Sequence, residues 1–184
     1  MTRARTLTLV VLSVAALSLT ACSSSSSSPT TTRAPAASTT PTTSGPPTTI
    51  PAADLSPAGT AGTAPTVTVP KGKPPTRLET ADLITGTGPA AKAGDSVTVQ
   101  YVLATYSSGK VIQSSWTAQP FTFTLDATPE QVIPGWDQGV VGMQVGGRRE
   151  LIIPPILGYR DQPPGAGIAV NDTLVFVVDL LKIN

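Results

Sequence analysis

The chain has 184 residues, with 12 Lys and Arg against 11 Asp and Glu, for a formal net charge of +1. It contains no histidine, which excludes histidine-dependent triads, histidine metal sites and imidazole acid–base chemistry. Its only cysteine, Cys22, excludes an internal disulfide and a thiolate metal cage. No basic stripe accompanies the aromatic residues, so we expect no nucleic-acid partner. The sequence thus predicts neither a metal site nor a cofactor.

The distribution of aromatic residues indicates where a hydrophobic core can form. All three Phe, all three Tyr and both Trp lie after residue 100, so a core is expected only in the C-terminal part. Seven basic and ten acidic residues fall within residues 76–184, whereas the segment before them carries five basic residues and one acidic residue. We therefore divide the chain into residues 1–21, 22–75 and 76–184, and expect only the last to fold as a domain.

The first 21 residues have the pattern of a secretory signal. Arg3 and Arg5 precede an apolar run over residues 7–19, which is short for a membrane span but typical of a signal h-region. The run ends in Leu19-Thr20-Ala21-Cys22, which resembles the bacterial lipoprotein signal, whose cysteine is acylated and becomes the first mature residue. The alternative is an ordinary signal peptide cut near Ala21. The lipoprotein reading predicts an extracytoplasmic protein that acyl chains on Cys22, such as palmitate, hold at the bacterial cell membrane.

Residues 22–75 are expected to form a disordered tether. After Cys22 come six serines, then mostly Thr, Pro, Ala and Gly, with eleven prolines and almost no large apolar side chain. Such a segment cannot bury enough surface to offset the entropy of ordering it. Two small apolar islands, Ile50 and Val67-Thr68-Val69, interrupt it. They could pair with another segment, but isolated short runs of this kind more often pack against nothing.

The last part of the chain alternates between strand patterns and turn signals. Apolar and polar residues alternate with a period of two between Val97 and Leu103, which predicts a half-buried strand with Tyr101 pointing inward. The segment Ser107-Ser108-Gly109-Lys110 predicts a hairpin turn. Strands are expected near residues 77–84, 97–103, 111–113, 121–125, 148–153 and 174–183. We expect Arg148-Arg149-Glu150 to lie on a solvated strand face.

One short helix is expected after Val132-Ile133. Pro134 suits the first helical position, where its missing N–H costs nothing, and Gly135 permits a tight turn before Trp136. Glycines at 142, 146 and 147 end the helix. One short helix across a face of about five antiparallel strands gives an α+β domain.

Four sequence blocks carry a family resemblance when they are taken together. They are Gly109-Lys110-Val111-Ile112-Gln113-Ser114-Ser115, Pro120-Phe121-Thr122-Phe123, Val132-Ile133-Pro134-Gly135-Trp136-Asp137-Gln138-Gly139-Val140 and Thr173-Leu174-Val175-Phe176. In this order and near-spacing, residues 76–184 resemble the FKBP family, the macrolide-binding peptidyl-prolyl cis-trans isomerases. The resemblance implies a five- to six-stranded antiparallel sheet wrapped around one short helix, with an apolar pocket between them. It also implies X-Pro-containing polypeptide clients and macrolides as ligands, and we expect a monomer.

The resemblance also implies which residues form the pocket. Those expected to act in catalysis are Tyr101, Phe121, Val132, Ile133, Trp136, Tyr159 and Phe176, and those expected to bind substrate beside them are Ile112, Gln113 and Ile168. Trp136 would form the floor. In the family, the backbone N–H at the position of Ile133 donates to a ligand carbonyl, and the hydroxyl at Tyr159 donates to another.

A few positions depart from the family pattern. Well-known members have Phe-Asp before Ser-Ser, whereas this chain has Ile112-Gln113, so an aromatic wall becomes aliphatic and a buried carboxylate becomes a neutral amide. Gly167 stands where an aliphatic side chain is usual, and Arg160 follows Tyr159 where glycine is common. The pocket is therefore expected to be wider and less polar at one edge.

Such a pocket could catalyse prolyl isomerisation without ionisable groups. Rotation about an X-Pro bond faces a barrier of about 18 to 20 kcal/mol from amide resonance, and no bond is made or broken. An apolar pocket that grips the pyrrolidine ring and strips water from the carbonyl disfavours the planar amide, while a few directed donors hold a turn-like geometry. We therefore predict a prolyl isomerase that assists the folding of extracytoplasmic proteins at the membrane surface.

Two other functions stay open. The Ile112-Gln113 departure would also suit a proline-peptide-binding or chaperone module with little turnover. The fold could also serve as a spacer in a structural envelope lipoprotein. Ser114-Ser115 near Lys110 does not predict a Ser-Lys hydrolase, because no glycine elbow surrounds either serine.

Overall fold

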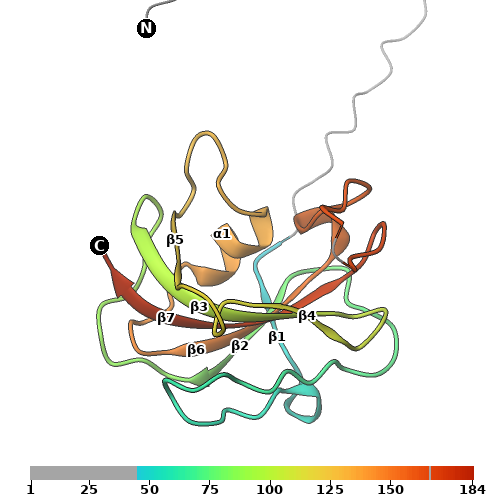
Figure 1. Ribbon diagram of the computed structural model, residues 1–184, viewed down its shortest axis with the longest axis horizontal. Helices are drawn as coiled ribbons and strands as arrows, with labels where there is room; N and C mark the ends of the chain where they lie inside the picture. The colour runs from blue at the N-terminus through green and yellow to red at the C-terminus, as the bar shows by residue number, and fades with distance from the viewer. Residues whose placement is uncertain (1–44, 166) are drawn as a thin grey trace, which may run out of the picture. The chain divides into compact units, whose positions relative to one another are not determined.

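A sheet that curves around one short helix forms the centre of the computed structural model, which describes residues 45–165 and 167–184 (Figure 1). The expected signal segment and Cys22 lie outside the described residues. No helix in the described ranges is long and apolar enough to span a membrane.

Within the described residues, seven strands form the sheet, in the order β1-β2-β6-β7-β3-β4, with β5 pairing with β3. They are β1 (Thr48–Thr49), β2 (Glu79–Ile84), β3 (Ser96–Thr105), β4 (Val111–Ser114), β5 (Phe121–Thr124), β6 (Arg148–Ile153) and β7 (Leu174–Ile183). All pairings among β2 to β7 are antiparallel, which confirms the expected antiparallel sheet. Strand β1, which the sequence did not predict, adds a parallel edge to β2.

Helix α1 (Pro134–Val140) packs against the inner face of the sheet, as expected. It begins after Ile133, whose extended backbone (φ −65°, ψ 146°) changes directly to helical geometry at the proline. Two glycines let the helix approach β6 closely. A Cβ at Gly135 would lie 2.4 Å from Ile153, and a Cβ at Gly139 would lie 2.7 Å from Leu151. Larger residues at either position would therefore push the helix away from the sheet.

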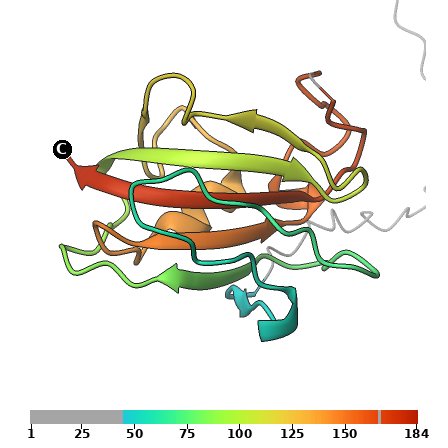
Figure 2. The same ribbon diagram turned by 60° about the horizontal axis from the view of Figure 1, so that its bottom comes forward.

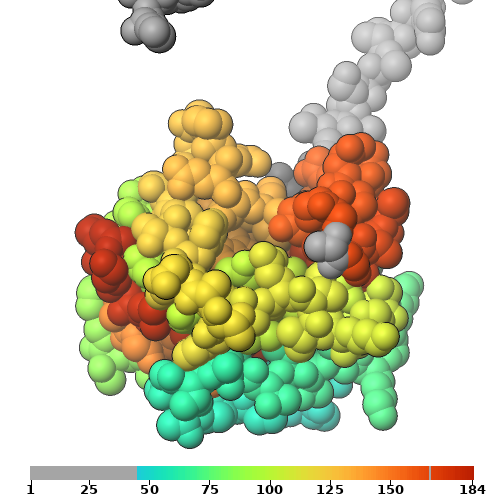
Figure 3. All heavy atoms as spheres, in the orientation of Figure 1, coloured from blue at the N-terminus to red at the C-terminus, as the bar shows by residue number. Residues whose placement is uncertain are grey.

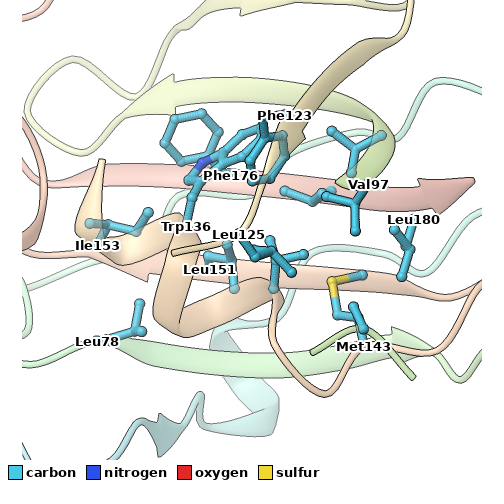
Figure 4. Packing of buried hydrophobic residues seen from close by; sticks show 14 of the residues in the cluster. Leu78, Val97, Phe123, Leu125, Trp136, Met143, Leu151, Ile153, Phe176 and Leu180 are labelled. Carbon is cyan, nitrogen blue, oxygen red and sulfur yellow. The ribbon is translucent and has the colours of Figure 1, made fainter. Parts of the chain in front are cut away.

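The main hydrophobic core lies between α1 and the sheet. Trp136, Phe123 and Phe176 gather beside the helix, and Leu151 and the other labelled side chains fill the space between it and the strands (Figure 4). The inward-facing side of β3 is as predicted, because Val97, Val99 and Leu103 belong to this core. The prediction of a half-buried strand is wrong, because Val102 and Ala104 on the other face of β3 are buried as well. Two short 3-10 helices, Ala52–Asp54 and Pro155–Leu157, are the remaining helical elements in the part of the chain that the structure describes.

The opposite face of the sheet is covered by residues 46–70, which we call the N-terminal strap (Figure 2). The expected disordered linker over residues 22–75 is therefore wrong for this stretch, and the ordered domain begins well before Thr76. Ile50 is only 2% exposed. It packs with Ile152 of β6 and Val175 of β7 in a second, smaller core that also contacts Leu55, Val67, Val69, Ala81 and Tyr106. The apolar islands are short, but they meet on one apolar face.

The expectation that Arg148 and Glu150 lie on a solvated face is also wrong. Arg148 is 1% exposed and Glu150 is fully buried. The Arg148 guanidinium donates to Asp179 of β7 through Nε (2.5 Å) and Nη2 (2.7 Å). It also donates to two strap carbonyls, Ala58 O at 2.8 Å and Thr63 O at 2.6 Å. The strap supplies the acceptors and donors that make burial of these charges possible.

Candidate active site

An open pocket of about 250 Å³ lies between α1, the sheet and the loop that follows the second 3-10 helix. In Figure 3 the segment before α1, which carries Gln131 to Ile133, is amber, and the loop that carries Tyr159 is orange-red; both lie in the upper part of the view. Eight of the ten predicted site residues line this pocket. They are Tyr101, Gln113, Phe121, Val132, Ile133, Trp136, Tyr159 and Phe176. The fold thus brings together residues that are as far as 75 positions apart in the sequence.

Trp136 lies at the centre of an aromatic cluster and is only 3% exposed. Its ring centroid lies 5.3 Å from that of Tyr101 and 5.2 Å from that of Phe176, and both contacts are edge-to-face. Phe121 lies 6.1 Å away and Phe123 5.3 Å away. Such edge-to-face contacts stabilise the arrangement beyond simple burial. Trp136 therefore forms a rigid, apolar floor that four other aromatic rings hold in place.

The polar groups of the pocket are few and uncharged. Burial raises the pKa of the Tyr159 hydroxyl above its ordinary value. Burial also raises the pKa of Tyr101, and the nearby Tyr159 adds to that rise. Both hydroxyls therefore remain protonated at neutral pH and can donate hydrogen bonds. The indole Nε1 of Trp136 is buried with no hydrogen-bond partner among the described residues.

The loop that carries Tyr159 is closed by its own hydrogen bonds. The Arg160 N–H donates to Pro155 O at 3.1 Å, and the Asn171 N–H donates to Arg160 O at 2.7 Å. The Arg160 side chain also folds back, since its Nε donates to Ile156 O at 3.0 Å. Arg160 adopts a positive φ of 53°, a conformation that glycine takes more readily. These bonds hold Tyr159 at the pocket although it lies in a long Gly- and Pro-rich loop.

Ile112 and Ile168 do not line the pocket. Both are half-buried and pack at the edge of the main core. Gly167 lies close to β4, because a Cβ at this position would be 3.4 Å from Ile112 Cγ2. The structure therefore places both isoleucines against the core, and neither is among the residues that line the pocket.

Gln131 also lines the pocket, although it is not among the predicted site residues. Its side-chain oxygen accepts a hydrogen bond from the Thr124 N–H at 2.9 Å, which ties the segment before α1 to the end of β5. A nearby carboxylate has a similar connecting role. Asp137 Oδ1 accepts the Asp126 N–H at 2.9 Å, and burial is the main cause of its raised pKa. The only sequence signal for Gln131 was its position directly before Val132.

No group of three or more residues that could hold a metal ion is found within the described ranges. The pocket offers aromatic faces, aliphatic side chains, two hydroxyls, two amide side chains and backbone groups. This chemistry suits a neutral, partly apolar ligand with a few carbonyl acceptors.

Comparison with known proteins agrees with this geometry. A model of the family described as FKBP-type peptidyl-prolyl cis-trans isomerase matches residues 88–181. The FK506-binding protein of Streptomyces anulatus is 51% identical over 104 residues, which cover 55% of this chain and 82% of that protein. A probable FK506-binding protein of Corynebacterium glutamicum is 40% identical over 104 residues, which cover 55% of this chain and 83% of the relative.

The solved structures give the same result. The crystal structure of AtFKBP13 matches with a TM-score of 0.53 and 32% sequence identity, over 60% of this chain and 96% of that one. The family match contains every residue that lines the pocket, from Tyr101 to Phe176, whereas the N-terminal strap precedes it. On the evidence of its pocket, its fold and its relatives, the chain belongs to the FKBP-type peptidyl-prolyl cis-trans isomerase family.

Proposed function

We propose that this isomerase assists the folding of extracytoplasmic proteins at the surface of the bacterial membrane, where acylated Cys22 holds it. The proposal for the catalytic step is supported by one observation above all. The buried indole of Trp136 faces a pocket whose remaining polar groups are neutral. Such a site suits a reaction in which an amide bond rotates and no proton is transferred.

In this proposal the pyrrolidine ring of a client proline lies over Trp136, between Tyr101 and Phe176. The Ile133 N–H, at the N-cap of α1, donates to a client carbonyl, and the Tyr159 hydroxyl donates to a second carbonyl. Both donors sit on backbone that is held in place, so the bound peptide keeps a turn-like shape. Removal of water from the prolyl carbonyl disfavours the planar, charge-separated amide relative to the twisted one.

A peptide relaxation assay tests this function. The full chain in detergent is expected to accelerate cis–trans relaxation of Leu-Pro and Phe-Pro peptides, and Trp136→Leu is expected to slow it more than tenfold. Tyr106→Phe is a matched control, since Tyr106 packs on the opposite face of the sheet. A folded wild-type protein that leaves the relaxation rate at background would reject the proposal.

The membrane anchor needs a separate experiment. Cells that express the full chain are grown with a palmitate analogue, and the label and the membrane fraction are followed for the wild type, Cys22→Ala and Ser23→Ala. We expect label and membrane association for the wild type and Ser23→Ala, and loss of both for Cys22→Ala. Retention of both by Cys22→Ala would remove the lipid anchor from the proposal.

A second candidate function is a proline-peptide-binding or chaperone module with little turnover. It is favoured by Gln113, which lines the pocket where well-known members of the family have a carboxylate. This candidate predicts that calorimetry detects binding of a proline peptide while relaxation stays at background. It also predicts that the pair Ile112→Phe and Gln113→Asp, which restores the family pattern, gains turnover. Fast relaxation by the wild type would remove this candidate.

The relatives named above are called FK506-binding proteins, and we propose that the pocket also accepts a macrolide of that kind. Competition between FK506 and a proline peptide tests this, because the two should exclude each other at Trp136.

We further propose that the protein acts as a monomer, since one chain contributes every residue that lines the pocket. Sedimentation velocity of the full chain in detergent would contradict this if a dimer formed at micromolar concentration.

A further inference from the structure

A tryptophan outside the pocket joins one wall of the active site to the N-terminal strap. Trp116 lies in the loop of residues 115–120, which connects β4 to β5. Gln113 and Phe121, one on each side of this loop, both line the pocket. The Trp116 ring centroid lies 6.0 Å from Arg148 Cζ, within the range of a cation–π contact. The loop between the two pocket residues therefore contacts Arg148 through the Trp116 ring.

Arg148 in turn is held by the strap. Its guanidinium has four hydrogen bonds, two to Asp179 and one each to the carbonyls of Ala58 and Thr63. Because a buried guanidinium needs all of these acceptors, a shift of either strap carbonyl must change where the guanidinium lies. The Nε1 of Trp116 is buried without a hydrogen-bond partner in the described part of the chain, so packing and the contact with Arg148 fix the indole.

We propose that the strap positions the pocket wall formed by Gln113 and Phe121, through Arg148 and Trp116. Trp116 is then a positioning residue for the isomerase, and the strap belongs to the catalytic unit although it precedes the family match at residues 88–181. The wall that it positions contains Gln113, where the chain departs from the family pattern. The inference rests on the proposed function of the pocket.

Two strap glycines provide a matched test of this coupling. Gly59 and Gly62 both adopt a positive φ, of 62° and 78°. A Cβ at Gly59 would lie 3.1 Å from Arg148 Nη1, whereas a Cβ at Gly62 would meet nothing within 4 Å. Alanine therefore strains the backbone at both positions but presses on Arg148 only in Gly59→Ala.

The experiment compares full-length wild type, Gly59→Ala, Gly62→Ala, Trp116→Leu and the double variant Gly59→Ala with Trp116→Leu. We expect kcat/KM for a Phe-Pro peptide to fall about three- to tenfold in Gly59→Ala and in Trp116→Leu. Gly62→Ala strains the backbone beside Thr63 but places no side chain against Arg148, so it should lower kcat/KM less than Gly59→Ala does, with a similar loss of thermal stability. In the Trp116→Leu background, Gly59→Ala should cause no further loss, because the path to the wall is already broken.

Trp116→Leu leaves Trp136 as the sole tryptophan, so its emission reports directly on the pocket. We expect the change in Trp136 emission on addition of a proline peptide to differ between Trp116→Leu and the wild type, once the emission of Trp116 is subtracted from that of the wild type. Equal effects of Gly59→Ala and Gly62→Ala on kcat/KM would overturn the proposal, as would additive effects in the double variant.

Calorimetric affinity for the same peptide is measured in parallel and does not need turnover. If the wild type binds peptide without catalysis, the proposed function fails while the coupling is still read from the affinities. If the affinities and kcat/KM follow the same order across the five proteins, the coupling is supported. If Trp116→Leu matches the wild type in both measurements, the coupling is rejected.

Discussion

Ser56 of the strap donates two hydrogen bonds to the Glu150 carboxylate, from its N–H to Oε2 at 2.7 Å and from Oγ to Oε1 at 2.9 Å. The Thr68 N–H donates to the same Ser56 hydroxyl at 2.9 Å. A fully buried carboxylate on β6 thus depends on a serine in a segment whose composition predicts disorder.

We predict that Ser56→Ala lowers the free energy of unfolding by about 1 to 3 kcal/mol, because it leaves a buried charge with one donor fewer. Urea unfolding of the full chain at pH 7 measures this. The control is Thr66→Ala, an exposed position in the same strap, which should stay within about 0.5 kcal/mol of wild type. Equal effects of the two substitutions would show that the Ser56 bonds contribute little.

The charge of Glu150 should make the strap sensitive to pH. Burial raises the pKa of this carboxyl, the hydrogen bonds from Ser56 oppose the rise, and Asp54 adds to it. The pKa of Glu150 is therefore higher in the folded protein than in the unfolded chain. The resulting stabilisation of the folded protein by the neutral carboxyl is fully present below the unfolded-state pKa. It is lost as the pH rises through the folded pKa.

Glu150→Gln removes this titration. We therefore predict that the free energy of unfolding of Glu150→Gln, measured relative to that of the wild type, rises as the pH rises from about 4 to about 8. Urea unfolding at several pH values checks the slope, with Glu130→Gln as the control at an exposed carboxyl. A constant difference between Glu150→Gln and wild type over this range would contradict the prediction.

The Tyr159 hydroxyl should matter for catalysis and little for stability. Tyr159→Phe keeps the ring that lines the pocket and removes one donor, so kcat/KM should fall about three- to tenfold. The thermal midpoint should change by less than about 2 °C. Tyr106→Phe, on the other face of the sheet, should leave kcat/KM unchanged. If both tyrosine variants retain full activity, Tyr159 is not a substrate donor.

Catalysis should be nearly independent of pH. The titratable groups that line the pocket are Tyr101 and Tyr159, and burial raises both pKa values above the ordinary tyrosine range. Both hydroxyls stay protonated well past neutrality, so kcat/KM should vary less than about twofold between pH 6 and pH 9. Relaxation assays across this range provide the measurement. A bell-shaped profile would contradict the prediction, because it requires a general acid or base that titrates in this range, and Tyr101 and Tyr159 do not.

Local patterns were sufficient to predict the family fold. The period of two around Tyr101 predicted β3, and the proline after Ile133 predicted the start of α1, because in both cases the signal lies within a few adjacent residues. The family blocks brought most pocket residues together before any contact was known. Gln131 was not predicted as a pocket residue, because its position there depends on how the loop before α1 folds.

The strap could not be predicted by the same means. Ile50 and Val67 are isolated in a polar, proline-rich stretch, and their partners Ile152 and Val175 lie about 100 residues away in the chain. The burial of Arg148 followed from the same missing information, since its strap acceptors are backbone carbonyls, which any sequence would supply. Long-range contacts of this kind leave almost no trace in composition.

Strand β1 fixes the chain to the sheet at Thr48, only 26 residues after Cys22. A fully extended chain spans at most about 3.5 Å per residue, so a lipid anchor at Cys22 would keep β1 within about 90 Å of the bilayer. If the chain were free up to Thr76, that limit would be about 190 Å. With such an anchor, the docking of the strap on the sheet would halve the maximum height above the membrane that the domain could reach.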